Sequence, residues 1–147
     1  MKKNIAKTPY VRKRSRTGLG LFATRLIKKG ERIVEYTGER ISQAEADKRG
    51  GQYLFEVTKN ITIDGKGREN IGRYINHACS PNAEAVIEGT RVFVYATEPI
   101  LPGEEIVYDY GKEFFDEYIK PKGCRCIACK PDKVIISPRS SSKKLVR

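Results

Sequence analysis

The feature that most constrains the fold is a succession of short β-type runs broken by turn residues. Tyr53–Thr58 and Ile61–Asp64 flank Lys59-Asn60, and Asn82–Glu88 and Arg91–Ala96 flank Gly89-Thr90. Each pair predicts a β-hairpin, because β-branched and aromatic residues favour strands and the residues between them favour turns. Further strands are predicted at Tyr10–Arg14, Leu21–Thr24, Arg32–Tyr36 and Glu105–Tyr110. Strands do not alternate with helices, which disfavours a doubly wound nucleotide-binding fold and predicts a mainly β fold.

Helix signals are few. Ser42-Gln43-Ala44-Glu45 has the form of a capping box, helix formers follow to Arg49, and Gly50-Gly51 ends the run. A second short helix is expected at Lys112–Tyr118, with its phenylalanines facing the body. Ser15–Gly20 is predicted to be a turn, because it contains two glycines.

The net charge of +11 is concentrated at the two ends of the chain. Residues 1–16 carry seven Lys or Arg and no acid, and residues 130–147 carry six against one acid. Such ends favour non-specific contact with nucleic acid or an acidic surface, and the alternative is that they are solvated and aid solubility. The sequence contains no apolar run of membrane-spanning length and no secretory signal, so we expect an intracellular protein of cytoplasm, nucleus or chromatin.

The four cysteines predict a structural zinc site. Cys124, Cys126 and Cys129 lie in one short segment, whereas Cys79 lies far upstream. In a reducing compartment clustered cysteines indicate metal ligands rather than disulfides. The fourth ligand is Cys79 or His77. Because the chain has four cysteines with none spare, an all-cysteine site that includes Cys79 is favoured. The alternative is that Cys79 is a small buried hydrophobic residue.

Three further segments carry candidate binding or catalytic residues. Thr17–Leu21 contains a G-x-G, which lets a backbone approach a ligand but is also common in tight turns. Gly72–Asn82 is dense in hydrogen-bonding side chains, among them Asn76 and His77. In Glu104–Gly111 two tyrosines stand at i and i+2, on one face of a strand.

Taken together, these segments resemble the SET domain family of protein lysine methyltransferases. The resemblance runs from about Tyr10 to Cys129, on GLGLFATRLIKKGERIVEYTGE, RYINHACSPNAEA, GEEIVYDYG and the cysteine cluster. It implies a fold of short sheets with few helices, in which the chain after YDYG passes through a loop around RYINHACSPN like a pseudoknot. The implied division is a basic flexible arm (1–9), the SET domain (10–111), a post-SET zinc-binding segment (112–130) and a basic flexible tail (131–147).

The resemblance also assigns roles to residues. S-adenosylmethionine would be bound by Gly18, Leu19, Gly20, Tyr53, Arg73, Asn76, His77 and Tyr110. The catalytic set would be Tyr110, Tyr36 in the lysine channel, and Tyr108 at the position that tunes the number of methyl groups. Zinc would be held by Cys79, Cys124, Cys126 and Cys129. The two residues between Cys126 and Cys129 are fewer than the four common in the family.

The implied activity is transfer of a methyl group to a lysine of a histone or another basic, DNA-associated protein. Tyr108 predicts mainly monomethylation, with some dimethylation. The alternative function is a zinc-containing module that binds chromatin or nucleic acid and has little or no catalysis. The presence of Tyr36, Tyr110, Asn76 and His77 favours the enzyme over this alternative.

Overall fold

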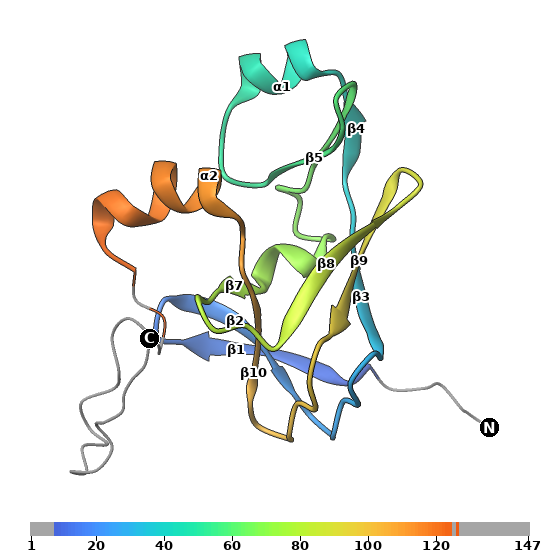
Figure 1. Ribbon diagram of the computed structural model, residues 1–147, viewed down its shortest axis with the longest axis vertical. Coiled ribbons are helices and arrows are strands. Elements are labelled where there is room, and N and C mark those ends of the chain that lie inside the picture. The colour runs from blue at the N-terminus through green and yellow to red at the C-terminus, as the bar shows by residue number, and fades with distance from the viewer. Residues whose placement is uncertain (1–7, 125, 127–147) are drawn as a thin grey trace.

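A computed structural model describes residues 8–124 and Cys126, and Figure 1 shows that strands dominate them. They form a four-stranded, a three-stranded and a second three-stranded sheet, accompanied by few and short helices. This confirms the predicted mainly β fold of short sheets. No helix among these residues is long and apolar enough to cross a membrane.

The four-stranded sheet has the order β1-β2-β10-β7. Its strands are β1 (Tyr10–Ser15), β2 (Gly18–Ala23), β10 (Glu105–Tyr108) and β7 (Asn76–His77). β10 runs antiparallel to β2 and parallel to β7, so it lies between strands that come from distant parts of the sequence. The segment after β7 also holds β10, because the backbone amides of Ala78 and Asn82 donate to the carbonyl oxygens of Tyr108 and Val107. This arrangement agrees with the crossing that the resemblance implies.

The other two sheets contain the predicted hairpins. One sheet, of order β3-β9-β8, consists of β3 (Arg32–Tyr36), β9 (Arg91–Ala96) and β8 (Ala83–Glu88). The other, of order β4-β6-β5, consists of β4 (Glu39–Ile41), β6 (Ile61–Asp64) and β5 (Leu54–Thr58). Both hairpins are therefore confirmed, whereas β4 is an addition to the prediction.

The predicted turn at Ser15–Gly20 is wrong in its second half. β1 ends at Ser15 and β2 begins at Gly18, so the glycines belong to a strand. β1 and β2 pair along their whole length, from Tyr10 with Ala23 to Ser15 with Gly18. Backbone pairing across the hairpin outweighs the weak strand preference of glycine.

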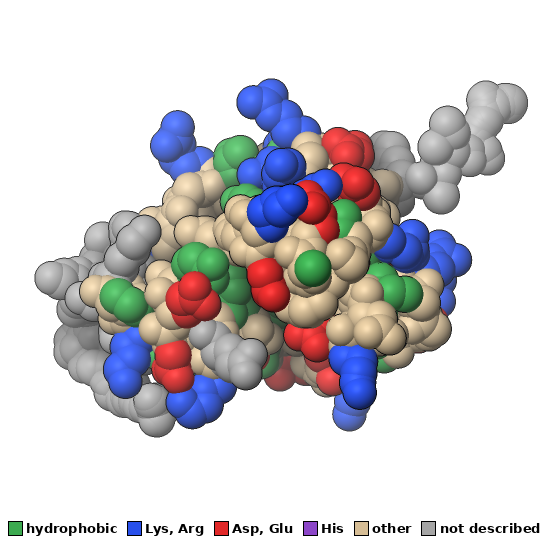
Figure 2. Space-filling view, turned by 90° about the horizontal axis from the view of Figure 1, so that it is seen from above, with side chains coloured by type: hydrophobic (Ala, Val, Ile, Leu, Met, Phe, Trp, Pro, Cys, Tyr) green, Lys and Arg blue, Asp and Glu red, His purple; other side chains and the backbone are tan. Residues whose placement is uncertain are grey.

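The helix α1 (Gln43–Arg49) starts where the sequence predicts. The Ser42 hydroxyl accepts from the Glu45 amide at 3.0 Å, which caps the helix. The Glu45 carboxylate accepts from Arg49 at 2.8 Å, and Arg49 also donates to Asp64. Figure 2 shows this end of the molecule, where acidic and basic side chains are interleaved.

The main core lies where β2, β9 and β10 meet. Leu21 and Ile106 are paired residues of β2 and β10, and both are buried in it. β10 continues into α2 (Lys112–Phe114), the π-helical turn η2 (Phe115–Ile119) and the 3₁₀ turn η3 (Lys120–Lys122). The helix expected at Lys112–Tyr118 is confirmed, and it leads the chain back to Cys79. The 3₁₀ turn η1 (Ile71–Tyr74) precedes β7.

Candidate active site

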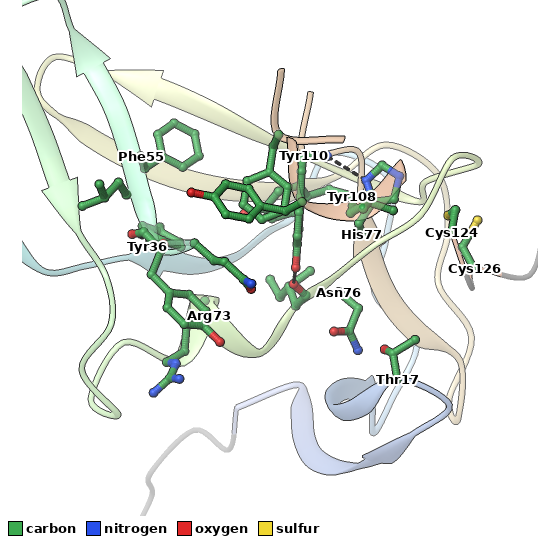
Figure 3. Close-up of a pocket in the computed structure, with 18 of the residues that line it drawn as sticks. Thr17, Tyr36, Phe55, Arg73, Asn76, His77, Tyr108, Tyr110, Cys124 and Cys126 are labelled. Atoms are coloured by element: carbon green, nitrogen blue, oxygen red, sulfur yellow. Dashed lines mark hydrogen bonds between the residues drawn. The ribbon is translucent and has the colours of Figure 1, made fainter. Parts of the chain in front are cut away.

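A cavity of about 450 Å³ collects most of the predicted site residues (Figure 3). Its wall includes Tyr36, Tyr53, Arg73, Asn76, His77, Tyr108, Tyr110, Cys124 and Cys126. They come from β3, the residue before β5, the η1–β7 segment, β10 with the residues after it, and the C-terminal turn. Segments distant in sequence and from all three sheets thus meet at one cavity.

Three tyrosines of this wall are held by hydrogen bonds or ring contacts. The Tyr36 hydroxyl donates to the Tyr53 carbonyl oxygen at 2.7 Å, and the Tyr110 hydroxyl donates to the Ile75 carbonyl oxygen. The Tyr108 and Tyr110 rings are 5.2 Å apart. Burial raises the pKa of each of these three phenols well above its ordinary value. All three therefore stay neutral at physiological pH.

Arg73 brings a buried donor to the cavity. Its guanidinium stacks on the Tyr53 ring, 4.4 Å from the centroid, and donates to the Lys66 carbonyl oxygen at 2.8 Å. Its Nε is buried, and within the described residues it has no hydrogen-bond partner. An unsatisfied buried donor in a cavity wall fits a ligand that carries an anionic or acceptor group.

His77 connects the cavity to the cysteines. Its Nδ1 accepts from the Tyr110 amide at 3.1 Å, and its Nε2 lies 3.5 Å from Cys79 Sγ. Burial lowers the pKa of His77 more than nearby Asp109 raises it, so the ring is neutral at pH 7. Since Nδ1 accepts, the single proton is on Nε2 and points to sulfur. His77 is therefore better suited to donate to a thiolate than to bind a metal.

Three of the four predicted zinc ligands lie together. Cys79 Sγ and Cys124 Sγ are 3.9 Å apart, and the Cys79 amide donates to Cys126 Sγ at 3.4 Å. Two sulfurs of a tetrahedral zinc site with bonds of about 2.3 Å are about 3.8 Å apart. The three thiols and the backbone donor therefore fit a structural zinc, although His77, Cys79 and Cys124 also form a compact donor group. Cys129 lies outside the described residues.

The G-x-G residues stand behind the cavity wall instead of lining it. Gly18, Leu19 and Gly20 are absent from the lining residues, and the Leu19 carbonyl oxygen accepts from Asn76 Nδ2 at 3.0 Å. In this structure β2 reaches the cavity lining through this bond between Leu19 and Asn76.

The cavity is also lined by residues that we did not assign to it from the sequence, among them Gln52, Phe55, Phe114 and Tyr118. Phe114 packs edge-on against Tyr110, and the Tyr118 hydroxyl donates to the Gly51 carbonyl oxygen at 3.1 Å. The predicted inward face of the helix at Lys112–Tyr118 was the one signal that could have found Phe114.

Comparison with known proteins agrees with this geometry. The family model described as SET domain matches residues 18–111. The H3 lysine-4 specific histone-lysine N-methyltransferase of Schizosaccharomyces pombe is 42% identical over 105 residues, which are 63% of this chain and 11% of that protein. The Saccharomyces cerevisiae enzyme of the same name is 39% identical over 126 residues, which are 76% of this chain and 12% of that protein.

A longer relative gives the same result. Histone-lysine N-methyltransferase trithorax of Drosophila virilis is 35% identical over 125 residues, which are 77% of this chain and 3% of that protein. The chain thus spans a small part of the length of each of these relatives. The family match covers well over half of the chain and includes Tyr36, Tyr108, Tyr110, Asn76 and His77 of the cavity. The chain therefore belongs to the SET domain family.

Proposed function

We propose that this protein transfers a methyl group from S-adenosylmethionine to a lysine side chain of another protein. The observation that carries the proposal is the meeting of Tyr36, Tyr108 and Tyr110 with Arg73 and Asn76 around one cavity. The methyl donor has a charged amino-acid end and a flat adenine, and it supplies an activated methyl group. A cavity with both polar and aromatic walls suits such a ligand.

The residues of the cavity divide into two groups under this proposal. Arg73 and Asn76 would hold the polar end of the methyl donor, with the buried Arg73 Nε facing an acceptor group. Tyr53 and His77 would form further parts of that pocket, and Gly18, Leu19 and Gly20 would support it from β2. Residues 10–111 would then be the SET domain and residues 112–130 the post-SET segment.

The aromatic wall would keep the reacting lysine uncharged. A free lysine has a pKa of about 10.4, so an unburied side chain is mostly protonated at pH 7 and cannot attack. The wall offers the ring of Phe55 and the rings and neutral hydroxyls of three tyrosines rather than carboxylates. Such surroundings disfavour the ammonium form by desolvation. Alignment of the amine with the methyl group would then provide much of the acceleration.

The three tyrosines would have separate tasks. The Tyr110 hydroxyl, whose position is fixed by the Ile75 carbonyl oxygen, would orient the methyl group. Tyr36 would position the amine from the opposite side of the cavity. The buried Tyr108 hydroxyl would occupy space that further methyl groups need, so the product would be mainly monomethyl-lysine, with some dimethyl-lysine.

A structural zinc bound by Cys79, Cys124, Cys126 and Cys129 would fix the C-terminal segment beside this cavity. The contacts of Cys79 with Cys124 and Cys126 support that assignment. Four thiolates leave no open coordination position, so the metal would have no part in the chemistry.

The names of the relatives support the proposed class of substrate. The relatives are named histone-lysine N-methyltransferases, two of them H3 lysine-4 specific. A histone or another basic, DNA-associated protein inside the cell is therefore the proposed substrate. The direct test is transfer of a radiolabelled methyl group onto histones and onto a cell extract, followed by mapping of the modified lysine. Incorporation of label that is lost when Tyr110 is replaced by Phe supports the proposal. Absence of label from both histones and the extract contradicts it.

Contact with DNA is a second proposed property, favoured by the edge strand β1. Arg12, Lys13 and Arg14 are exposed there, and none pairs with a carboxylate of the described residues. Arg12 and Lys13 instead lie over the rings of Tyr74 and Phe22, at 4.8 and 5.0 Å from the centroids. Their charges remain available for phosphates.

The test compares two triple variants that lose equal charge. Changing Arg12, Lys13 and Arg14 to Gln should weaken binding of a short DNA duplex and lower the salt slope by up to about 3, roughly 0.9 for each lost phosphate contact. Changing Lys48, Lys59 and Lys120 to Gln should have little effect. Equal affinities of the two variants would contradict the assignment to β1.

A protein that binds DNA but neither binds the methyl donor nor transfers its methyl group would be the non-catalytic module.

A further inference from the structure

A carboxylate behind the cavity wall holds one of the lining residues. Glu105 of β10 does not line the cavity, whereas Asn76 of β7 does. Glu105 Oε2 accepts from Asn76 Nδ2 at 2.8 Å. The same nitrogen lies 3.0 Å from the Leu19 carbonyl oxygen and 3.1 Å from Ser15 Oγ. Three oxygens, one each from β1, β2 and β10, therefore surround the amide nitrogen of Asn76.

These contacts allow one orientation of the Asn76 amide. An ionised carboxylate and a backbone carbonyl are acceptors only. A flipped amide would bring Oδ1 against both oxygens, and it would lose the charge-assisted bond to Glu105. Nδ2 of Asn76 therefore faces the sheet. Its acceptor Oδ1 is on the opposite side of the same amide, and the side chain lines the cavity.

Gly20 provides the space in which this pair fits. A Cβ on Gly20 would lie 2.4 Å from Glu105 Oε2 and 3.0 Å from Asn76 Nδ2. The backbone of Gly20 does not have the positive φ that favours glycine. The absence of a side chain therefore serves the Glu105–Asn76 contact rather than an unusual turn.

We propose that Glu105 is a positioning residue, which fixes the side-chain amide of Asn76 so that its oxygen meets a hydrogen-bond donor of the bound methyl donor. Gly20 is the glycine of β2 that leaves room for this carboxylate. The proposal rests on the function proposed above, because it names the support of that ligand's pocket.

The surroundings of Glu105 are consistent with this role. Burial raises the pKa of Glu105, and the hydrogen bond from Asn76 and the charge of Arg16 lower it in part. The phenol of Tyr110 also interacts with this carboxylate, and Phe22 lies opposite it in the β2–β10 pair. Glu105 is thus a half-buried carboxyl group whose hydrogen bond from Asn76 favours its ionised form.

The experiment measures the affinity of the full chain for S-adenosylmethionine by calorimetry. Glu105→Ala should weaken binding about tenfold or more, the usual effect of losing a hydrogen bond to a charged group. Glu105→Gln should lie between this variant and the parent, because its carbonyl oxygen can still accept. Glu104→Gln is the matched control on the same segment, since Glu104 accepts from the Leu101 amide and does not reach Asn76. It should bind like the parent.

A pH series and a double variant separate positioning from general damage. The ratio of the Glu105→Gln and parent dissociation constants should approach 1 as the pH falls through the pKa of Glu105, because the protonated parent then resembles the variant. Titration of His77 and of the ligand is common to both proteins and cancels. Gly20→Ala should weaken binding in the parent and much less in the Glu105→Ala background, because the displaced carboxylate is already absent.

The outcomes can be told apart. A parent that binds and a folded Glu105→Ala variant with parental affinity would overturn the positioning role alone. A parent that does not bind the methyl donor would overturn the proposed function and this inference with it. If Glu105→Ala does not fold, Gly20→Ala provides the same displacement, and parental affinity in that variant would also overturn the role.

Discussion

The hydroxyl of Tyr36 donates a 2.7 Å hydrogen bond to the backbone carbonyl oxygen of Tyr53, 17 residues away in the sequence. This bond joins β3 to the residue that precedes β5. Tyr36→Phe should remove it and leave a part-buried carbonyl without its partner, at a cost of about 1–3 kcal/mol in the free energy of unfolding. Urea unfolding measures this loss, with Tyr10→Phe as a control outside the cavity. A loss no larger than that of the control would contradict the structural part of this role.

Tyr110→Phe should lower turnover by about 100-fold or more, since a fixed hydroxyl beside the reacting atoms would be lost. Affinity for S-adenosylmethionine should change little, because Arg73 and Asn76 are untouched. Single-turnover kinetics and calorimetry separate the two effects. Undiminished turnover would remove Tyr110 from the catalytic set.

Tyr108→Phe should shift the product from monomethyl-lysine toward dimethyl- and trimethyl-lysine. The Tyr108 side chain is buried beside Tyr110, so loss of its hydroxyl enlarges the cavity where the amine would lie. Mass spectrometry of a modified peptide gives the product ratio at equal conversion. An unchanged ratio would show that this hydroxyl does not limit methyl addition.

Removal of zinc should loosen the C-terminal segment and reduce activity. Cys126→Ser removes a sulfur that accepts from the Cys79 amide, and chelation should have the same effect, since binding of a structural metal contributes to folding. Ser80→Ala, next to Cys79, is the control. The parent should contain about one zinc per chain by atomic absorption. Far less metal in a folded, active protein would exclude the site.

Glu105→Gln should stabilise the protein at neutral pH while it weakens binding. The pKa of Glu105 is raised in the folded protein, so its ionised form is destabilised by folding. The stabilising effect of protonation is complete below the unfolded pKa and is lost as the pH rises through the folded pKa. The variant should therefore melt above the parent at pH 7 and converge with it below about pH 4. A parent that is the more stable at pH 7 would contradict this.

Local sequence signals were sufficient for the hairpins and for α1. Lys59-Asn60 and Gly89-Thr90 are turn residues between β-type runs, and Ser42 caps a run of helix formers, so each element is determined by neighbouring residues. β4 and β7 could not be found in this way. β7 has two residues, and its partner Val107 lies 31 residues further along the chain. Only the folded arrangement provides that partner.

Cavity residues that belong to a sequence motif could be predicted, whereas those outside any motif were missed. Arg73, Asn76 and His77 stand in one recognisable run, whereas Phe55, Phe114 and Tyr118 are ordinary aromatic residues in their own segments. The reason for a glycine at position 20 also could not be predicted from its neighbours in the sequence. Its sequence context indicated a turn near a ligand, and its requirement for space arises from Glu105, 85 positions away.

The location of β10 between β2 and β7 has a consequence for biosynthesis. A nascent chain that ends before Glu105 can form both hairpins and α1, but β2 and β7 lack the strand that joins them. Such an intermediate would expose the apolar side chains that Ile106 later covers, and methyl-donor binding could begin only after Tyr110 leaves the ribosome. Protection by chaperones would therefore matter most until the segment that contains β10 has been synthesised.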